Sequence, residues 1–115
     1  MAERVEYLPL GSVVVIKGGY KKFVIVGRGL MVNINGGQKY FDYAACEYPE
    51  GIIGDRVMYF QHKDINKVIF EGYKDEENEL VVQAINDIYT DNKIERADTK
   101  TVKMEMNNGK NAGRV

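Results

Sequence analysis

Cysteine and histidine each occur once in this chain of 115 residues, and tryptophan is absent. A single cysteine, Cys46, excludes an intrachain disulfide framework. Cys46 and His62 also cannot supply the usual zinc ligand sets, which need about four Cys, His or carboxylate groups at short spacing. A Cys–His nucleophile pair needs both groups within hydrogen-bond reach, and nothing in the sequence places these two residues together. The residues therefore predict no catalytic group, no metal, no cofactor and a protein that is not an enzyme.

Long hydrophobic runs are missing as well. No apolar run reaches the roughly 18 residues that a membrane-spanning helix needs. Residues 1–6 lack the basic-then-apolar pattern of a signal peptide. We therefore expect a cytoplasmic protein without a membrane span. The net charge is −1, which argues against nucleic-acid binding as the main activity, because such domains usually carry a basic face.

Glycine is frequent, but its spacing does not match that of phosphate-binding loops. Lys17-Gly18-Gly19 lacks the spacing of a P-loop, and Gly27-Arg28-Gly29 has no third glycine three residues on. Neither motif opens a helix whose backbone N–H groups could hold a phosphate. We interpret the first motif as a turn and the second as a β-bulge.

The acidic residues do not indicate a catalytic carboxylate pair. Asp42, Glu47, Glu50 and Asp55 flank a turn at Tyr48–Gly51. A glycosidase-type pair needs two carboxyl groups roughly 5–10 Å apart in a cleft. A domain of this length rarely offers such a cleft, so we expect these four side chains to be solvated loop charges.

The segment Leu8–Arg28 organises the rest of the chain. It contains two apolar runs, rich in β-branched and aromatic residues, separated by a short break rich in Gly and Lys. This pattern predicts a hairpin with strands at Ser12–Lys17 and Phe23–Gly27, both heavily buried. The second strand is expected to resume after the bulge and to continue to Ile34.

Three further strands are predicted at regular spacing. Asn35-Gly36 favours a type I′ turn into a strand at Gln38–Ala45, which carries aromatic residues on both faces. Val57–Gln61 and Lys67–Gly72 predict the fourth and fifth strands. The polar segment between them fits a single helical turn with Asp64 as its cap.

An amphipathic helix is predicted over Glu76–Tyr89. Asp75 can accept hydrogen bonds from the first backbone donors, and acidic residues favour a helix N-terminus. The apolar stripe that should pack on the sheet comprises Leu80, Val81, Ala84, Ile85, Ile88 and Tyr89.

These elements predict a single mainly β (α+β) domain over residues 1–90. We expect about five strands in a small, strongly curved antiparallel sheet or SH3-like barrel, with one C-terminal amphipathic helix. An open α+β sheet with the helix on one face is the alternative. Residues 1–7 are expected to be a loose entry, with packing at the edge as an option for Val5 and Tyr7. Residues 91–115 are expected to be a polar extension, with an edge strand over 101–106 as one option and then a mobile tail.

Tyrosine is abundant, with eight residues, and it offers contact area and a polar tip at protein interfaces. Aromatic residues also fill the ends of small β domains, so a role in the core is the alternative. Aromatics together with Lys21, Lys22, Arg28 and Lys39 would suit a stacking face for nucleic acid. The residues predicted to contact a partner are Tyr20, Arg28, Tyr43, Tyr48, Glu50 and Tyr73.

Several segments together resemble a family of small domains from Gram-positive bacteria, the domain of unknown function 4176. The resemblance covers about residues 7–90, and the segments occur in the family's order. Members of this family tend to be encoded in type VII secretion loci, beside LXG-type polymorphic toxins. The segments are Leu8–Val14, Lys17–Gly19, Val26–Arg28, Tyr48–Gly51, Asp64-Ile65 and Val68–Glu77.

The resemblance implies a non-enzymatic accessory protein that binds an LXG-type toxin or an export component, as a chaperone or targeting factor. It supplies no catalytic residues. One alternative is an immunity protein that neutralises the cognate toxin. An acidic face would favour that role against a nuclease toxin, but the acidic residues are scattered along the sequence. A second alternative is a small-barrel nucleic-acid-binding module, although the expected partner is a protein.

Overall fold

Six strands and one α-helix form the structure, a computed structural model that describes residues 4–91 and 94–97. The mainly β class with one late helix is confirmed. Along the chain the elements are β1 (Val13–Ile16), β2 (Lys22–Ile34), β3 (Gly37–Tyr48), β4 (Met58–Phe60), the 3₁₀ turn η1 (His62–Asp64), β5 (Ile65–Phe70), α1 (Glu76–Asp91) and β6 (Glu95–Arg96).

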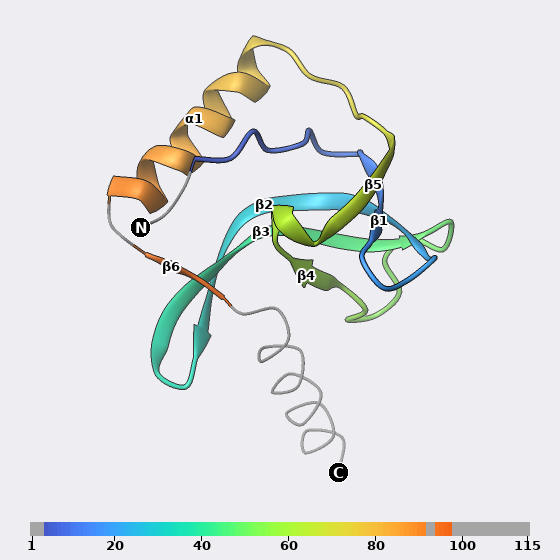
Figure 1. Cartoon of the computed structure of the whole chain (residues 1–115), viewed down its shortest axis with the longest axis horizontal. Coiled ribbons are helices and arrows are strands. Elements are labelled where there is room, and N and C mark those ends of the chain that lie inside the picture. The colour runs from blue at the N-terminus through green and yellow to red at the C-terminus, as the bar shows by residue number, and fades with distance from the viewer. Residues whose placement is uncertain (1–3, 92–93, 98–115) are drawn as a thin grey trace.

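The strands form one sheet in the order β4-β3-β2-β1-β5, and β6 pairs with β3 off this path (Figure 1). Neighbours along the path are antiparallel, whereas β6 runs parallel to β3. Within the described residues the outer strands β4 and β5 do not pair with each other. The sheet is therefore open and is not closed into an SH3-like barrel.

The long hairpin of β2 and β3 forms the centre of the sheet. Asn35 and Gly36 connect the two strands with φ angles of 51° and 79°, and the predicted Asn-Gly turn is confirmed. The bulge lies earlier than predicted. Ile25 pairs with Ala45 and Gly27 pairs with Ala44, so the extra residue is Val26 rather than a residue of the Arg28-Gly29 pair.

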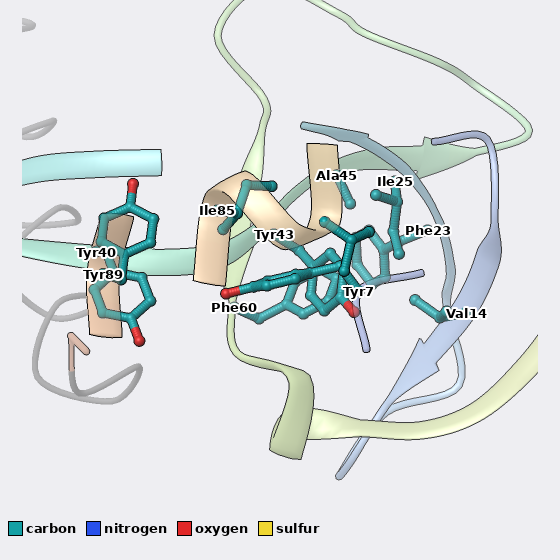
Figure 2. Packing of buried hydrophobic residues seen from close by; sticks show 11 residues of the cluster. Tyr7, Val14, Phe23, Ile25, Tyr40, Tyr43, Ala45, Phe60, Ile85 and Tyr89 are labelled. Carbon is teal, nitrogen blue, oxygen red and sulfur yellow. The ribbon is translucent and has the colours of Figure 1, made fainter. Parts of the chain in front are cut away.

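The main core lies between the sheet, α1 and the N-terminal segment (Figure 2). On β3, every side chain from Tyr40 to Cys46 is buried, which agrees with the prediction that neither face of this strand is solvated. A smaller cluster around Phe41 and Ala97 covers part of the sheet separately from the main core. The buried residues of the main core are Tyr7, Val14, Phe23, Ile25, Tyr40, Tyr43, Ala45, Phe60, Val82, Ile85 and Tyr89.

The N-terminal segment, residues 4–8, runs beneath α1 (Figure 1). Val5 and Tyr7 pack there, as the sequence allowed, so the described part of this segment is not a loose entry. The side chain of Asn86 on α1 bonds the backbone of Val5 twice: Oδ1 accepts from the Val5 N–H at 2.8 Å, and Nδ2 donates to the Val5 carbonyl at 2.9 Å. Tyr7 and Asn86 are each 5% exposed. Buried polar groups are costly to leave unpaired, so this contact ties the segment to the helix.

Helix α1 packs through a face that differs from the predicted stripe. Ile85 and Tyr89 are buried as expected, and the Tyr89 ring stacks on Tyr40 with centroids 3.9 Å apart. Val82 and Asn86 are the other buried residues, because they lie on the same side of the helix as Ile85 and Tyr89. The remaining four residues of the predicted stripe are exposed: Leu80, Val81, Ala84 and Ile88.

Gly29 on β2 allows the close approach of α1. It has a φ of +60°, and a Cβ at this position would lie 2.8 Å from Ile85 Cγ2 and 3.2 Å from Tyr89 Cε2. The Tyr89 hydroxyl also donates a hydrogen bond to the Gly29 carbonyl. We expect Gly29→Ala to lower the free energy of unfolding by about 2 kcal/mol, through left-handed strain and overpacking. Urea denaturation would measure this effect, and an unchanged midpoint would contradict it.

Residues 94–97 return to the sheet after the helix. The Ala97 N–H donates to the Tyr40 carbonyl at 2.9 Å, and Gln61 Nε2 donates to the Ala97 carbonyl at 2.8 Å. Ala97 is 4% exposed. Part of the expected extension therefore contributes to the packed domain, whereas the strand considered over 101–106 lies outside the described residues.

Candidate functional site

The six residues predicted to contact a partner do not share one surface. Tyr20 and Tyr73 are 98% and 82% exposed, and both lie in loops. Tyr48 and Glu50 lie together at the end of β3, whereas Arg28 is partly buried beneath α1. Tyr43 has an exposure of 0%, so the structure corrects its placement on the surface.

Tyr43 is buried because several elements close over its ring. The Tyr7 and Phe60 rings lie 5.7 and 5.6 Å from it, centroid to centroid. Its hydroxyl oxygen accepts a hydrogen bond from the Leu8 N–H at 2.9 Å and lies 2.7 Å from His62 Nδ1. Burial raises the pKa of Tyr43 well above its ordinary value. Tyr43 is a core residue that joins the N-terminal segment to the 3₁₀ turn.

Tyr48 and Glu50 contact basic residues of the adjacent strand end. Lys21 Nζ lies 2.7 Å from Glu50 Oε1, and this hydrogen bond lowers the pKa of the exposed Glu50 carboxyl. Lys22 Nζ lies 5.7 Å from the centre of the Tyr48 ring. These contacts group Lys21, Lys22, Tyr48 and Glu50 at one end of the β2–β3 pair.

The other cations of the predicted stacking face have partners elsewhere in the chain. Arg28 donates to the Leu8 carbonyl at 3.2 Å and to Asn78 Oδ1 at 2.7 Å. Desolvation lowers the pKa of the Arg28 guanidinium. Lys39 lies 3.8 Å from a carboxylate oxygen of Glu95. The four predicted cations therefore occupy three separate environments.

Asp42 is the residue that the sequence placed least well. It is 1% exposed and not a solvated loop charge. Its Oδ1 accepts from the Tyr7 hydroxyl at 2.9 Å and from Arg96 Nε at 3.1 Å, and its Oδ2 accepts from the His62 N–H at 2.9 Å. The signal available in the sequence was its position on a strand that carries aromatic residues on both faces, with Tyr40 on its own face. A carboxylate on a strand covered on both faces has little access to water.

Gln61 extends this buried polar cluster to the neighbouring backbones. It is 1% exposed, and its Oε1 accepts from the Asp42 N–H at 2.9 Å. Its Nε2 donates to the carbonyls of Tyr40 and Ala97, at 3.1 and 2.8 Å. One side chain thus connects β3 to the residue that follows β6. Gln61 was not predictable from the sequence, because glutamine at a strand end has no distinctive pattern.

The charges of Asp42 and Arg96, together with burial, also shift the pKa values of the neighbouring tyrosines. Burial, followed by the charge of Asp42, raises the pKa of Tyr7 far above its ordinary value. Burial also raises the pKa of Tyr40 to about 12, although the charge of Arg96 opposes this. The pKa of Arg96 is raised, since its interaction with Asp42 outweighs the cost of burial. Both phenols are therefore neutral near neutral pH.

The buried polar cluster of Tyr7, Asp42, Gln61, His62 and Arg96 has a structural role, because its hydrogen bonds hold the N-terminal segment, η1 and β6 against β3. We call it the clamp. Both Asp42 oxygens accept hydrogen bonds from this chain, and His62 Nδ1 is occupied by the Tyr43 hydroxyl. Cys46 is buried on β3, opposite Val24. Within residues 4–91 and 94–97, no group of three or more His, Cys, Asp and Glu residues is arranged to hold a metal ion.

Acidification is expected to weaken the clamp at His62. The Tyr43 hydroxyl already accepts from Leu8, so we assign its own proton to a neutral His62 Nδ1. Desolvation lowers the pKa of His62, and the Asp42 charge opposes this only partly. The unfolded chain therefore binds a proton more readily, and stability should fall as the pH drops through about 6.5.

The check is the midpoint of urea unfolding, measured at about pH 7.5 and about pH 5.5, on either side of the ordinary pKa of histidine. His62→Gln should lose less stability than the wild-type protein between these two conditions, because it cannot gain a proton. Equal losses in both proteins would assign the pH dependence to other groups.

Apolar side chains also gather on the surface, at two places that the core does not use. Phe70 is 60% exposed on β5, beside Val68 and Ile69 at 43% each. Leu80 is 70% exposed on α1 and Ile88 is 51% exposed. Large exposed apolar groups that adjoin one another are typical of interaction sites. Among the described residues, no helix has the length and apolar character needed to cross a membrane.

Comparison with known proteins identifies a family without giving an activity. The model of a family described as Domain of unknown function (DUF4176) matches residues 7–81, more than half of the chain. No curated protein and no solved structure matches significantly. The match begins at Tyr7 and ends at Val81, so it includes the whole sheet path from β1 to β5 and the start of α1.

Proposed function

Because the chain belongs to the DUF4176 family, a family of unknown function, we propose that it is a non-enzymatic accessory protein of type VII secretion. In this role it binds an LXG-type toxin, or a component of the export machinery, in the cytoplasm. It acts as a chaperone or targeting factor by covering an exposed surface of that partner. The support for this proposal comes from the surface that the fold leaves uncovered.

The observation that carries the proposal is the edge strand β5. It lies at one end of the sheet path, with β1 as its neighbour. Asn66 to Phe70 are all exposed, and the last three of these residues are apolar. Natural edge strands are usually protected by charges, proline or a covering element, because their free backbone groups can pair with another chain. Lys67 is the one charged residue of β5, and the three residues after it carry no charge. An extended partner segment could pair with β5 and bury Val68 or Phe70.

The test is capture of the protein encoded beside this one in its native host. Tagged wild-type protein should co-purify with the adjacent toxin, and deletion should reduce export of that toxin. Phe70→Glu should abolish capture, because it places a charge in the paired surface. Met31→Glu is the matched control, since Met31 is also exposed but lies on β2. Absence of any captured partner, together with unchanged export, would refute the proposal.

A second candidate function is immunity to the cognate toxin, and the charge of α1 favours it. Glu76, Glu77 and Glu79 all lie in the first turns of the helix. Between Glu76 and Tyr89 the sequence contains no lysine or arginine. These three residues are close together in the sequence as well, and the helix presents them at its N-terminal end, where such an acidic cluster suits a basic toxin domain.

Growth measurements distinguish the two functions. An immunity protein should restore growth when it is expressed together with the isolated toxin domain. A chaperone or targeting factor should instead alter toxin secretion and give little protection.

A further inference from the structure

Helix α1 has a second apolar face, which the described part of the chain leaves uncovered. Leu80, Val81, Ala84 and Ile88 form a stripe along it, because residues separated by three or four positions share a helix face. Leu80 is 70% exposed, Ile88 51% and Val81 46%. The buried side of the helix faces the N-terminal segment and the sheet (Figure 1). A helix with apolar residues on two faces needs a second surface to cover the outer one.

Acidic residues extend the two rows of this stripe. Glu76 precedes Leu80 by one helical turn, and Glu77 precedes Val81 in the same way. Glu79 adds a third carboxylate within the first turns, and no basic residue lies in the last turn. A partner that covers the stripe therefore meets apolar side chains next to negative charge.

We propose that the stripe of Leu80, Val81, Ala84 and Ile88 is the docking surface for an amphipathic helix of a partner protein, with Lys or Arg beside its apolar face. Ala84 is small and lies between Leu80 and Ile88, so a second helix can approach at the 8–10 Å typical of packed helices. Basic side chains on that helix would face the glutamates. This inference rests on the proposed function, in which the chain binds a protein, and it adds a second contact with that partner, at α1, to the pairing proposed at β5.

A parallel pairing of α1 with the same helix of a second copy does not fit this description. Glu76, Glu77 and Glu79 would then face the same residues of the other copy. Opposed like charges disfavour this arrangement, and the carboxylates favour an occupant with basic flanks.

The test uses synthetic helical peptides of about 18 residues, or about five turns, with full-length protein. The first probe has Leu at helical spacing and Lys on its flanks. The second keeps the Leu pattern and replaces Lys with Glu. The third has the composition of the first in a scrambled order, without an apolar face. Fluorescence anisotropy should show that the first peptide binds at least about tenfold more tightly than either control.

Two sets of variants locate the binding on α1. The double variant Leu80→Gln, Ile88→Gln should bind the first peptide about tenfold or more weakly. Met31→Gln, at an exposed position on β2, should leave the affinity unchanged. Glu76→Lys, Glu77→Lys and Glu79→Lys together should reverse the preference toward the Glu-flanked peptide. Circular dichroism would confirm that each variant remains folded.

Four results would overturn the inference. Equal binding of the scrambled peptide would show attraction by charge alone. Unchanged binding in the α1 variants would place the peptide elsewhere on the protein. If the wild-type protein is a dimer and the Leu80→Gln, Ile88→Gln variant is a monomer, the stripe is occupied by a second copy of this chain. Failure of toxin capture with peptide binding intact would refute only the proposed function, whereas capture without peptide binding would refute only this surface.

Discussion

Gly72→Ala is expected to lower the free energy of unfolding by about 3 kcal/mol or more, which is at the upper end for overpacking a buried site. Gly72 is buried just after β5, where the chain crosses the turn before β1. A Cβ at this position would overlap the Leu10 carbonyl oxygen and lie 3.1 Å from the carbonyl carbons of Leu10 and Gly11. These neighbours are backbone atoms, which cannot rotate aside as a side chain can.

The same site holds a hydrogen bond that a shift of the backbone would break. The Gly72 N–H donates to Ser12 Oγ at 2.9 Å, and Ser12 Oγ donates to the Pro9 carbonyl at 2.7 Å. Ser12 has an exposure of 0%, so the lost contact would leave polar groups without access to water. Urea and thermal denaturation measure the effect.

Gly19→Ala is the matched control for Gly72→Ala. A Cβ on Gly19 would have the Ile16 carbonyl oxygen as its nearest neighbour, at an ordinary 3.9 Å. We expect a change within about 0.5 kcal/mol, as for other surface substitutions. Similar stabilities for the two variants would show that the crossing at Gly72 is not as tight as the structure indicates.

Asp42→Ala is expected to cost about 3 kcal/mol, a value typical of breaking a buried ionic contact. The substitution removes the acceptor of the Tyr7 hydroxyl and that of the His62 N–H. It also removes one contact of the Arg96 guanidinium. Asp42→Asn should cost less, because the amide retains one oxygen as an acceptor.

Hydrogen exchange would separate this effect from a general loss of stability. The Ala97 N–H, bonded to the Tyr40 carbonyl, should exchange faster in Asp42→Ala, because Arg96 then holds its segment less firmly. Glu50→Ala removes a carboxylate whose partner Lys21 is on the surface and should change stability little. An exchange rate at Ala97 that follows global unfolding alone would argue against the clamp.

Local features of the fold were the ones that the sequence predicted well. The Asn35-Gly36 turn depends on the conformations that these two residues favour, and the helix from Glu76 depends on its cap and its period. The position of the bulge at Val26 was not predictable, because it depends on how β2 pairs with β3.

Residues held by distant contacts were predicted poorly. Aromatic residues on both faces of their strand indicated that neither face is solvated, but the groups that bury Asp42 and Tyr43 come from distant positions: Tyr7, Phe60 and Arg96. The stripe on α1 was interpreted as one core-facing surface, although its period fits two faces. The contacts of Ile85 and Tyr89 with the sheet, together with those of Asn86 with Val5, show which side of the helix faces inward.

The N-terminal segment beneath α1 also constrains how the protein can fold during synthesis. Val5 and Asn86 are 81 positions apart, and their two hydrogen bonds form only when both have left the ribosome. The β1–β3 strands can pair earlier, since their contacts are closer in sequence. The ribosome must therefore release nearly all of the described domain before the helix can dock, and until then Tyr40 lacks the Tyr89 ring that stacks on it.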